Sequence, residues 1–466
     1  MNNQNFNEEH FEEGNEDIRY YEKLFENNPK SLIDFSACES LISHYIQNGK
    51  LEKALDITNH AVKLYPATSE LLIKKAQILM DLSRNVEAMS ILDVAQKLDP
   101  SNEEIFCLRA SNCVEKGKHQ EAIFWLDKAL ELSEYPEEIY YQKGEVYQNI
   151  EDYEKAVFFY EKCLEKDPEH EDAIYDLAFC YDVIGHGEKS ARLYEKFIDY
   201  QPYSHIAWYN LGIVYSKLHR FQDALDATEY AVLIKKDFSS AYFNMGNTYI
   251  EMGDYEKALP LFFSTMEYEG PSPETLCCIG ECNFKIKKWE NAKRFFTNAL
   301  EMNNKMSEAW FGLALSYDAV KNFKEAKHAL KKALALEEKN PDYWLTLAEL
   351  EFKTGHLLRT IHLYQEAATL FPNYKYIWLD WSGVVYELGF CEEAAQILKV
   401  AVAQLPSDAD VNYRLAIYLL SQNKIKRALR FLRKAFELNP TLPKSFKKDF
   451  IKITNHKEIV KFMEKY

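Results

Sequence analysis

Glycine and proline are scarce in this chain of 466 residues, which has 15 and 14 copies of them. Sheet-rich proteins use these residues at their many turns, so their scarcity favours a helical fold. Long apolar runs are missing too, because no stretch approaches the ~18 apolar residues of a membrane-spanning helix. The acidic start MNNQNFNEEHFEEGNEDIRYY lacks the basic and apolar segments of a signal peptide. We therefore expect no membrane insertion and a cytoplasmic location.

The motifs of common catalytic and cofactor sites are also absent. The sequence has no Gly-rich phosphate loop and no His-Glu-x-x-His, and no two of its 12 His are four residues apart. The nine Cys are not spaced as a disulfide framework, which indicates a reducing compartment. Cys277, Cys278 and Cys282 form one cluster, but adjacent helical residues point roughly 100° apart and suit apolar packing better than metal binding. We expect a non-catalytic protein with no cofactor and no metal.

The chain also lacks an excess of positive charge. It has 56 Lys and Arg against 73 Asp and Glu, which gives a formal net charge of −17. Nucleic-acid binding needs clustered cations, so no nucleic-acid partner is expected. The charge is uneven: residues 1–17 contain six acidic and no basic residues, and residues 421–466 contain 13 Lys or Arg against four Asp or Glu. These ends are either solvated termini or, at the basic end, a contact for an acidic partner.

A small residue recurs every 34 residues, which is typical of a repeat architecture. One series is Ala at ten of its 12 positions: Ala54, Ala88, Ala122, Ala156, Ser190, Ala224, Ala258, Ala292, Ala326, Thr360, Ala394 and Ala428. Twelve residues upstream runs a second series of small residues with one exception: Ile42, Ala76, Ala110, Gly144, Ala178, Gly212, Gly246, Gly280, Ala314, Ala348, Ser382 and Ala416. Two antiparallel helices approach closely only where side chains are small, so these series predict a helix pair in each repeat.

Turn residues and aromatic residues keep the same period. Proline closes the second helix at seven positions: Pro66, Pro100, Pro168, Pro202, Pro372, Pro406 and Pro440. Between the two helices, six repeats share a glycine that permits a left-handed end of the first helix: Gly49, Gly117, Gly185, Gly253, Gly355 and Gly389. Large residues at spacings of three, four and seven keep to one helical face, so most of the aromatic content is predicted to be core.

The repeat resembles the tetratricopeptide (TPR) family, whose pattern is Trp-x2-Leu-Gly-x2-Tyr followed by Ala and Ala. The best match is Trp208, Leu211, Gly212, Tyr215, Ala224 and Ala231. Ile42 departs from the second series of small residues, and Phe197 and Thr265 replace the second Ala of the pattern in the fifth and seventh repeats. The resemblance implies an all-α fold, a right-handed α-solenoid superhelix with capping helices at its ends. It also implies a scaffold or adaptor that binds other proteins.

The pattern divides the chain into an acidic tail, a capping helix, the repeats and a basic end. We expect a disordered tail at 1–17, an N-terminal capping helix at 18–34 and C-terminal capping helices at 443–466. Residues 35–442 hold twelve repeats without insertion: 35–68, 69–102, 103–136, 137–170, 171–204, 205–238, 239–272, 273–306, 307–340, 341–374, 375–408 and 409–442.

The resemblance implies that the first helix of each repeat lines a concave groove, where the residue after the Trp or Tyr position would face a partner. The groove residues predicted to bind an extended peptide or protein are Tyr141, Gln142, Tyr175, Asp176, Tyr209, Asn210, Phe243, Asn244, Asn247 and Phe311. Amide side chains can bond the backbone of an extended chain, and Tyr offers a rigid surface with a polar tip. The alternative is that these residues only pack between adjacent first helices.

Two further alternatives remain for the function. The chain could be a regulatory or targeting subunit of an enzyme or complex, docking through its convex face or its basic C-terminal end. An RNA-binding helical repeat would need basic groove positions, which are aromatic or acidic here. The Lys, Asn and Arg set with which chaperone-binding family members hold a C-terminal carboxylate is absent from every three successive repeats. The sequence does not indicate the partner or the oligomeric state.

Overall fold

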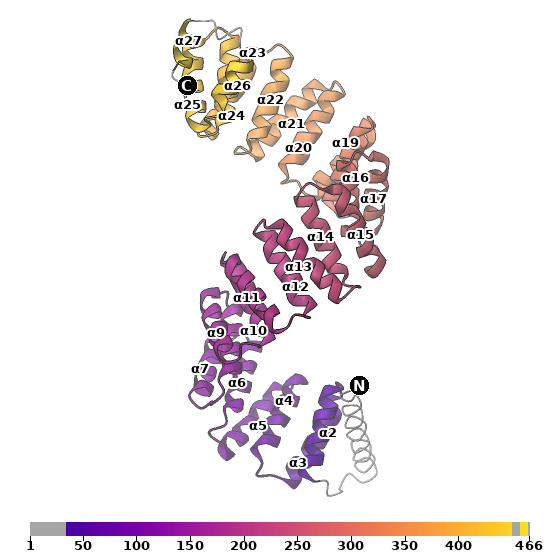
Figure 1. The fold of residues 1–466 in the computed structure, drawn as a ribbon, viewed down its shortest axis with the longest axis vertical. Coiled ribbons are helices and arrows are strands. Elements are labelled where there is room, and N and C mark those ends of the chain that lie inside the picture. The colour runs from indigo at the N-terminus through magenta and orange to yellow at the C-terminus, as the bar shows by residue number, and fades with distance from the viewer. Residues whose placement is uncertain (1–33, 450–456, 465–466) are drawn as a thin grey trace. The chain divides into compact units, whose positions relative to one another are not determined.

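The computed structural model describes residues 34–449 and 457–464, and these residues form helices and turns without a strand (Figure 1). The chain divides into two compact parts, Met1–Ile234 and Lys235–Tyr466, here the N-terminal part and the C-terminal part. The expected acidic tail, and the expected N-terminal capping helix apart from Asp34, lie outside the described residues. The all-helical α-solenoid class predicted from the sequence is confirmed.

Twelve helix pairs follow one another, and their first helices begin every 34 residues. The first helices are α2 (Phe35–Gln47), α4 (Ser69–Asp81), α6 (Glu103–Glu115), α8 (Glu137–Asn149), α10 (Glu171–Val183), α12 (His205–Lys217), α14 (Ser239–Glu251), α16 (Pro273–Lys285), α18 (Ser307–Ala319), α20 (Pro341–Lys353), α22 (Lys375–Glu387) and α24 (Ala409–Ser421). The second helices are α3 (Leu51–Leu64), α5 (Asn85–Leu98), α7 (His119–Leu130), α9 (Tyr153–Lys166), α11 (Gly187–Tyr200), α13 (Phe221–Ile234), α15 (Tyr255–Glu269), α17 (Trp289–Met302), α19 (Phe323–Leu336), α21 (Leu357–Leu370), α23 (Cys391–Gln404) and α25 (Ile425–Leu438).

The turn inside each pair has the same backbone conformation in all twelve repeats. The six glycines of the shared position have φ between 68° and 90°, in the left-handed region. The other six repeats place a residue with a side chain there, also at positive φ: Ser83, Glu151, His219, Lys287, Lys321 and Asn423. The pairing of the helices therefore imposes this turn even where the sequence does not provide glycine.

The small residues lie where the two helices of a pair meet. A Cβ added to Gly212 of α12 would lie 2.3 Å from Thr228 Oγ1 and 3.1 Å from the Ala224 carbonyl oxygen of α13. Ala224 itself is 1% exposed. The two series of small residues thus mark close contact between helices, as the sequence indicates.

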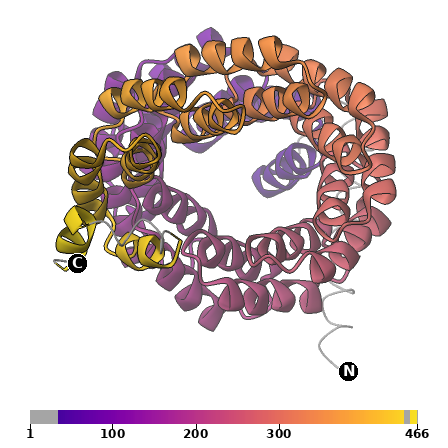
Figure 2. The same ribbon diagram turned by 90° about the horizontal axis from the view of Figure 1, so that it is seen from above.

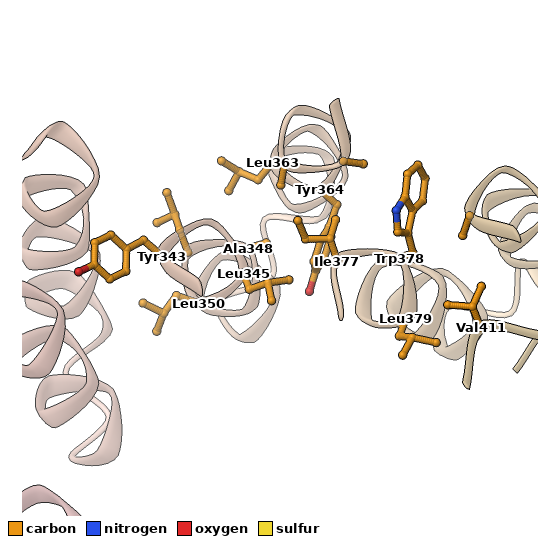
Figure 3. Close-up of a cluster of buried hydrophobic side chains, with 14 of the residues drawn as sticks. Tyr343, Leu345, Ala348, Leu350, Leu363, Tyr364, Ile377, Trp378, Leu379 and Val411 are labelled. Atoms are coloured by element: carbon orange, nitrogen blue, oxygen red, sulfur yellow. The ribbon is translucent and has the colours of Figure 1, made fainter. Parts of the chain in front are cut away.

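The core runs along the stacked pairs and is continuous in the C-terminal part. There a single cluster of buried side chains extends from Ala258 to Met463. Figure 3 shows its middle section, which includes Tyr364 of α21 and Ile377 of α22. Two short helices, α26 (Leu442–Asp449) and α27 (Lys457–Met463), contact α25 and bury Phe446, Ile459 and Phe462 against this cluster.

Candidate functional site

Successive first helices approach one another more closely than successive second helices do. Contacts between first helices join α4 to α6 and α8 to α10 in the N-terminal part, and α16 to α18 and α22 to α24 in the C-terminal part. No pair of successive second helices among the described residues makes contacts of this extent. Stacked pairs therefore curve toward the first helices, whose side we call the inner face. Figure 2 shows the resulting two layers of helices in the C-terminal part (rose to yellow).

All ten predicted groove residues lie on first helices and are half-buried. Six belong to the N-terminal part, on α8, α10 and α12: Tyr141, Gln142, Tyr175, Asp176, Tyr209 and Asn210. Four belong to the C-terminal part, on α14 and α18: Phe243, Asn244, Asn247 and Phe311. Within the C-terminal part α16 separates these two helices in sequence, so they do not form one continuous row.

The aromatic members pack against neighbouring helices within the chain. Phe243 meets Phe262 edge-on with ring centroids 5.5 Å apart, and Phe311 lies 4.6 Å from the ring of Tyr343. Tyr175 packs against Tyr194 at 6.1 Å. Phe243 and Tyr175 thus pack against the second helix of their own repeat, and Phe311 packs against the next first helix, as the alternative interpretation of the sequence requires. These contacts leave only part of each ring for a partner.

The polar members on α8 and α10 form a connected group. Tyr141 donates a hydrogen bond from its hydroxyl to Asp176 Oδ2 at 3.0 Å, which joins α8 to α10. The Gln142 amide donates from Nε2 to Glu138 Oε1 at 3.2 Å. That bond fixes the orientation of the amide, and its buried acceptor Oε1 has no hydrogen-bond partner among the residues that the structure describes. Buried polar atoms are normally paired, so an acceptor without a donor is a candidate contact for a ligand.

A cavity of about 250 Å³ lies beside Gln142, between α6 and α8. Its apolar wall includes Val114, Leu126 and Val146, and its polar rim includes Glu115 and Glu145. The cavity therefore combines apolar surface with hydrogen-bond acceptors, which suits a side chain that carries N–H donors.

Glu145 is the member of this site that the sequence analysis did not select. It reaches solvent, but the helices around it restrict its hydration, and Asp176 and Glu138 add negative charge; together these raise the pKa of its carboxyl to about 7. Burial also raises the pKa of Asp176. A signal for Glu145 was present in the sequence, because it occupies in the fourth repeat the position that Asn247 holds in the seventh.

The same acidic pair recurs in the C-terminal part, six repeats later. Glu349 of α20 and Asp380 of α22 occupy the positions of Glu145 and Asp176, and burial raises the pKa of both carboxyls. Here cations lie nearby, since Lys353 lowers the pKa of Glu349 and Arg414 lowers that of Asp380. In the N-terminal part, by contrast, the titratable groups that shift the Glu145 pKa are acidic groups and Tyr141, and no cation is among them.

The raised pKa of Glu145 predicts a change of stability with pH. The folded chain holds a proton on Glu145 up to about pH 7, whereas an unfolded glutamate loses it near its ordinary value of 4.5. Between these pH values the folded chain therefore binds more protons than the unfolded chain, and the free energy of unfolding falls as the pH rises through this window. We expect the melting temperature of Glu145→Gln to fall less between pH 5 and pH 8 than that of the wild type. The contribution of Glu145 to the change of the unfolding free energy with pH is below about 1 kcal/mol, because its side chain reaches solvent.

Glu154→Gln is the matched control, because Glu154 is exposed on α9. It should keep the wild-type difference between the two pH values. An unchanged pH dependence in Glu145→Gln would show that Glu145 ionises normally.

Family models described as tetratricopeptide repeat match this chain in six places. Four different models cover residues 103–136, 137–170, 193–226, 239–262, 286–350 and 384–443. These matches lie in both parts of the chain. The chain belongs to the tetratricopeptide repeat family. Its membership supports a role as a protein–protein interaction scaffold.

Solved structures of TPR proteins resemble stretches of this TPR chain. The crystal structure of YrrB, titled a TPR protein with an unusual peptide-binding site, is 16% identical with a TM-score of 0.35, and the match covers 40% of this chain and 96% of YrrB. Two crystal structures of MamA are each 25% identical, with TM-scores of 0.33 and 0.35; they cover 35% and 37% of this chain, and 95% and 94% of MamA. A search of curated proteins found no match.

The described residues contain no group of three or more His, Cys, Asp or Glu placed to hold a metal ion. Burial raises the pKa of Cys277, Cys278 and Cys282 to about 12, so these thiols stay protonated near neutral pH. No helix in the ranges 34–449 and 457–464 has the length and apolar character needed to cross a membrane. Non-catalytic function remains a prediction.

Proposed function

We propose that this TPR protein is a non-catalytic scaffold or adaptor that binds an extended peptide or protein segment on its inner face. The observation that carries the proposal is the buried Gln142 Oε1 without a donor, beside a cavity of about 250 Å³ between two first helices. An extended segment has N–H donors at regular intervals along its backbone, which such an acceptor can bind.

The surroundings of Gln142 favour a ligand rich in donors. Glu115 and Glu145 line the same cavity. Asp176, on the next first helix α10, accepts a hydrogen bond from Tyr141 of α8. These groups are acceptors when ionised, so the inner face of the N-terminal part offers acceptors from α6, α8 and α10. Tyr209 and Asn210 on α12 would extend the contact within this part. Both side chains are half-buried.

Binding of peptides selected on the full-length chain tests this proposal. Peptides from a displayed random library are selected on the immobilised wild type, and the affinity of the best synthetic peptide is measured by fluorescence anisotropy. We expect the variant Gln142→Ala/Glu145→Ala to weaken binding about tenfold, since losing the hydrogen bonds to two acceptors costs ~1–3 kcal/mol in total.

The matched control is Gln120→Ala/Glu154→Ala, the same residue types on exposed positions of the second helices α7 and α9. It should bind like the wild type. Amide hydrogen exchange should also show protection of α6, α8 and α10 by the peptide. Equal affinity of the wild type and the inner-face variant would reject the inner face as the binding site.

A second candidate function, a targeting or regulatory subunit that docks through its basic end, is favoured by one observation on α25. This helix carries five cations, none of which forms an ion pair with a described residue: Lys426, Arg427, Arg430, Arg433 and Lys434. The first four are exposed. An acidic partner surface would be attracted to such a helix.

A further inference from the structure

A second kind of cavity lies on the opposite side of the repeats, between successive second helices of the N-terminal part. Its volume is about 310 Å³. Glu195 and Asp199 of α11 form one wall, Asp226 and Tyr230 of α13 form the other, and Trp208 of α12 forms the floor. We call it the Trp208 pocket. It lies away from the inner face, so it is separate from the site of the proposed function.

The floor and one wall of the Trp208 pocket are aromatic and fixed in place. The Trp208 indole stacks on the ring of Tyr230 with centroids 4.6 Å apart and planes inclined by 28°. Trp208 Nε1 donates a hydrogen bond to the Pro202 carbonyl oxygen at 2.9 Å, which holds the indole. Tyr230 is 52% exposed, so an aromatic surface faces solvent beside the cavity.

Carboxylates stand on both walls, and three of them have no ion-pair partner in the part of the chain that the structure describes. Tyr215, only 8% exposed, donates its hydroxyl to Glu195 Oε1 at 2.5 Å and so holds this carboxylate at the pocket. Asp226 accepts a hydrogen bond from Gln222 Nε2 at 2.8 Å. Asp199 is exposed and has no hydrogen-bond or ion-pair partner within residues 34–449 and 457–464.

The fourth carboxylate shows how a guanidinium is held at the edge of this pocket. Arg220 Nε lies 2.7 Å from Asp223 Oδ2, and its guanidinium carbon lies 4.2 Å from the centre of the Tyr215 ring. At this edge of the pocket, Arg220 therefore contacts a carboxylate and an aromatic face at the same time. The remaining carboxylates and the Trp208–Tyr230 stack offer the same two contacts to a further guanidinium.

The C-terminal part contains the equivalent cavity without the charge. Five repeats after Trp208, Trp378 lines a cavity of about 380 Å³ between α21 and α23. In Figure 3 Trp378 extends from α22 in the direction opposite to Leu379, which holds the position of the predicted groove residues. Neutral residues replace the three unpaired carboxylates, with Gln365, Thr369 and Gln396 in place of Glu195, Asp199 and Asp226. The repeat therefore creates the cavity at both positions, and of these two cavities the Trp208 pocket is the acidic one.

We propose that the Trp208 pocket binds an arginine side chain of a basic segment in a partner protein. The planar guanidinium fits between carboxylates and an aromatic face, and a lysine ammonium matches this arrangement less well. An adjoining hollow of about 350 Å³ shares Asp226 and Tyr230 and continues to Glu229 and Leu233. Leu233 is 73% exposed, so it offers apolar surface to the residues that neighbour the arginine in the partner segment. Aromatic residues and arginine are enriched at protein interfaces.

The test uses three fluorescein-labelled nine-residue peptides that differ only at three positions, which hold arginine, lysine or citrulline. Citrulline has nearly the shape of arginine without its charge. Binding to the full-length chain is measured by anisotropy. We expect the arginine peptide to bind most tightly and the citrulline peptide at least tenfold more weakly. Equal binding of the arginine and citrulline peptides would overturn the proposal.

The pocket variant Glu195→Gln/Asp199→Asn/Asp226→Asn should lose at least tenfold in affinity for the arginine peptide. The matched control, Glu52→Gln/Asp56→Asn/Glu154→Gln, makes the same change of net charge at exposed positions of α3 and α9. It should change the affinity less than twofold. An equal loss in both variants would mean general attraction to an acidic chain and would overturn the proposal.

A gain of function in the neutral copy completes the test. Adding Gln365→Glu/Thr369→Asp/Gln396→Asp to the pocket variant should restore arginine-peptide binding, now at the Trp378 cavity. The inner-face variant Gln142→Ala/Glu145→Ala should bind the arginine peptide like the wild type. Loss of binding in this inner-face variant, with binding retained by the pocket variant, would place the peptide on the inner face and overturn the proposal.

Discussion

Replacing Phe296 by alanine is expected to lower the free energy of unfolding by about 3–5 kcal/mol, the cost of removing a large aromatic side chain from a packed core. Phe296 is 3% exposed on α17. Its ring fills the space between glycines on two successive first helices. A Cβ added to Gly280 would lie 2.8 Å from Phe296 Cδ1, and one added to Gly312 would lie 2.2 Å from Phe296 Cζ.

Denaturant unfolding followed by circular dichroism measures this loss, and amide hydrogen exchange shows whether it falls on α16 to α18. Phe390→Ala is the control, because Phe390 is 56% exposed and its removal should cost less than about 1 kcal/mol. A loss for Phe296→Ala no larger than that of the control would contradict the buried position of the ring.

A double-mutant cycle tests the role of the glycine. Gly312→Ala should destabilise the wild type by about 1–3 kcal/mol through overpacking against Phe296. The same change should be tolerated in Phe296→Ala, where the ring is gone. Additive effects of the two changes would mean that Phe296 and Gly312 do not share this contact.

Replacing Lys327 by methionine is expected to cost about 3 kcal/mol, near the lower end for breaking a buried ion pair. Lys327 Nζ lies 2.6 Å from Glu351 Oε2, and Glu351 is 3% exposed. Burial alone would raise the pKa of Glu351, but the bond from Lys327, with Arg359 and His356 nearby, holds it below its ordinary value. Without Lys327 the ion-pair partners that the buried carboxylate keeps among the described residues are Arg359 at 3.3 Å and the His356 ring at 3.0 Å.

The double variant Lys327→Met/Glu351→Leu should recover much of this loss, because it leaves no buried charge behind. Thermal and denaturant unfolding of the single and double variants give the interaction energy. The control is Lys353→Met, since Lys353 pairs with Asp318 in a more exposed bridge and should cost less than about 1 kcal/mol. A cost for Lys327→Met as small as this would mean that the pair is not buried in solution.

The helix pairs could be predicted from the sequence because each repeat contacts mainly its neighbours. Small residues such as Gly212 and Ala224 recur at a fixed distance, and this period is visible without any knowledge of the fold. The all-helical solenoid class and the family membership were both predicted in this way, and both are confirmed. The partner-binding role of the ten groove residues stays a prediction, and their half-buried positions fit both binding and packing.

The environment of Glu145 was not predictable in the same way. Its pKa depends on the restricted hydration of its carboxyl and on Asp176, which is 31 residues away in the sequence and lies near it only when α8 and α10 stack. The Trp208 pocket likewise needs carboxylates from α11 and α13 around a floor from α12. In the sequence these acidic residues look like ordinary solvated positions of second helices.

The sequence by itself determined the repeat, its helix pairs and the positions of small and aromatic residues, because local periodicity and packing between adjacent helices impose them. The tertiary structure alone decided which side chains of different repeats meet: Phe296 between two glycines, Lys327 with Glu351, and the carboxylates around Trp208. Such contacts depend on distances across helices, which a single linear pattern does not encode.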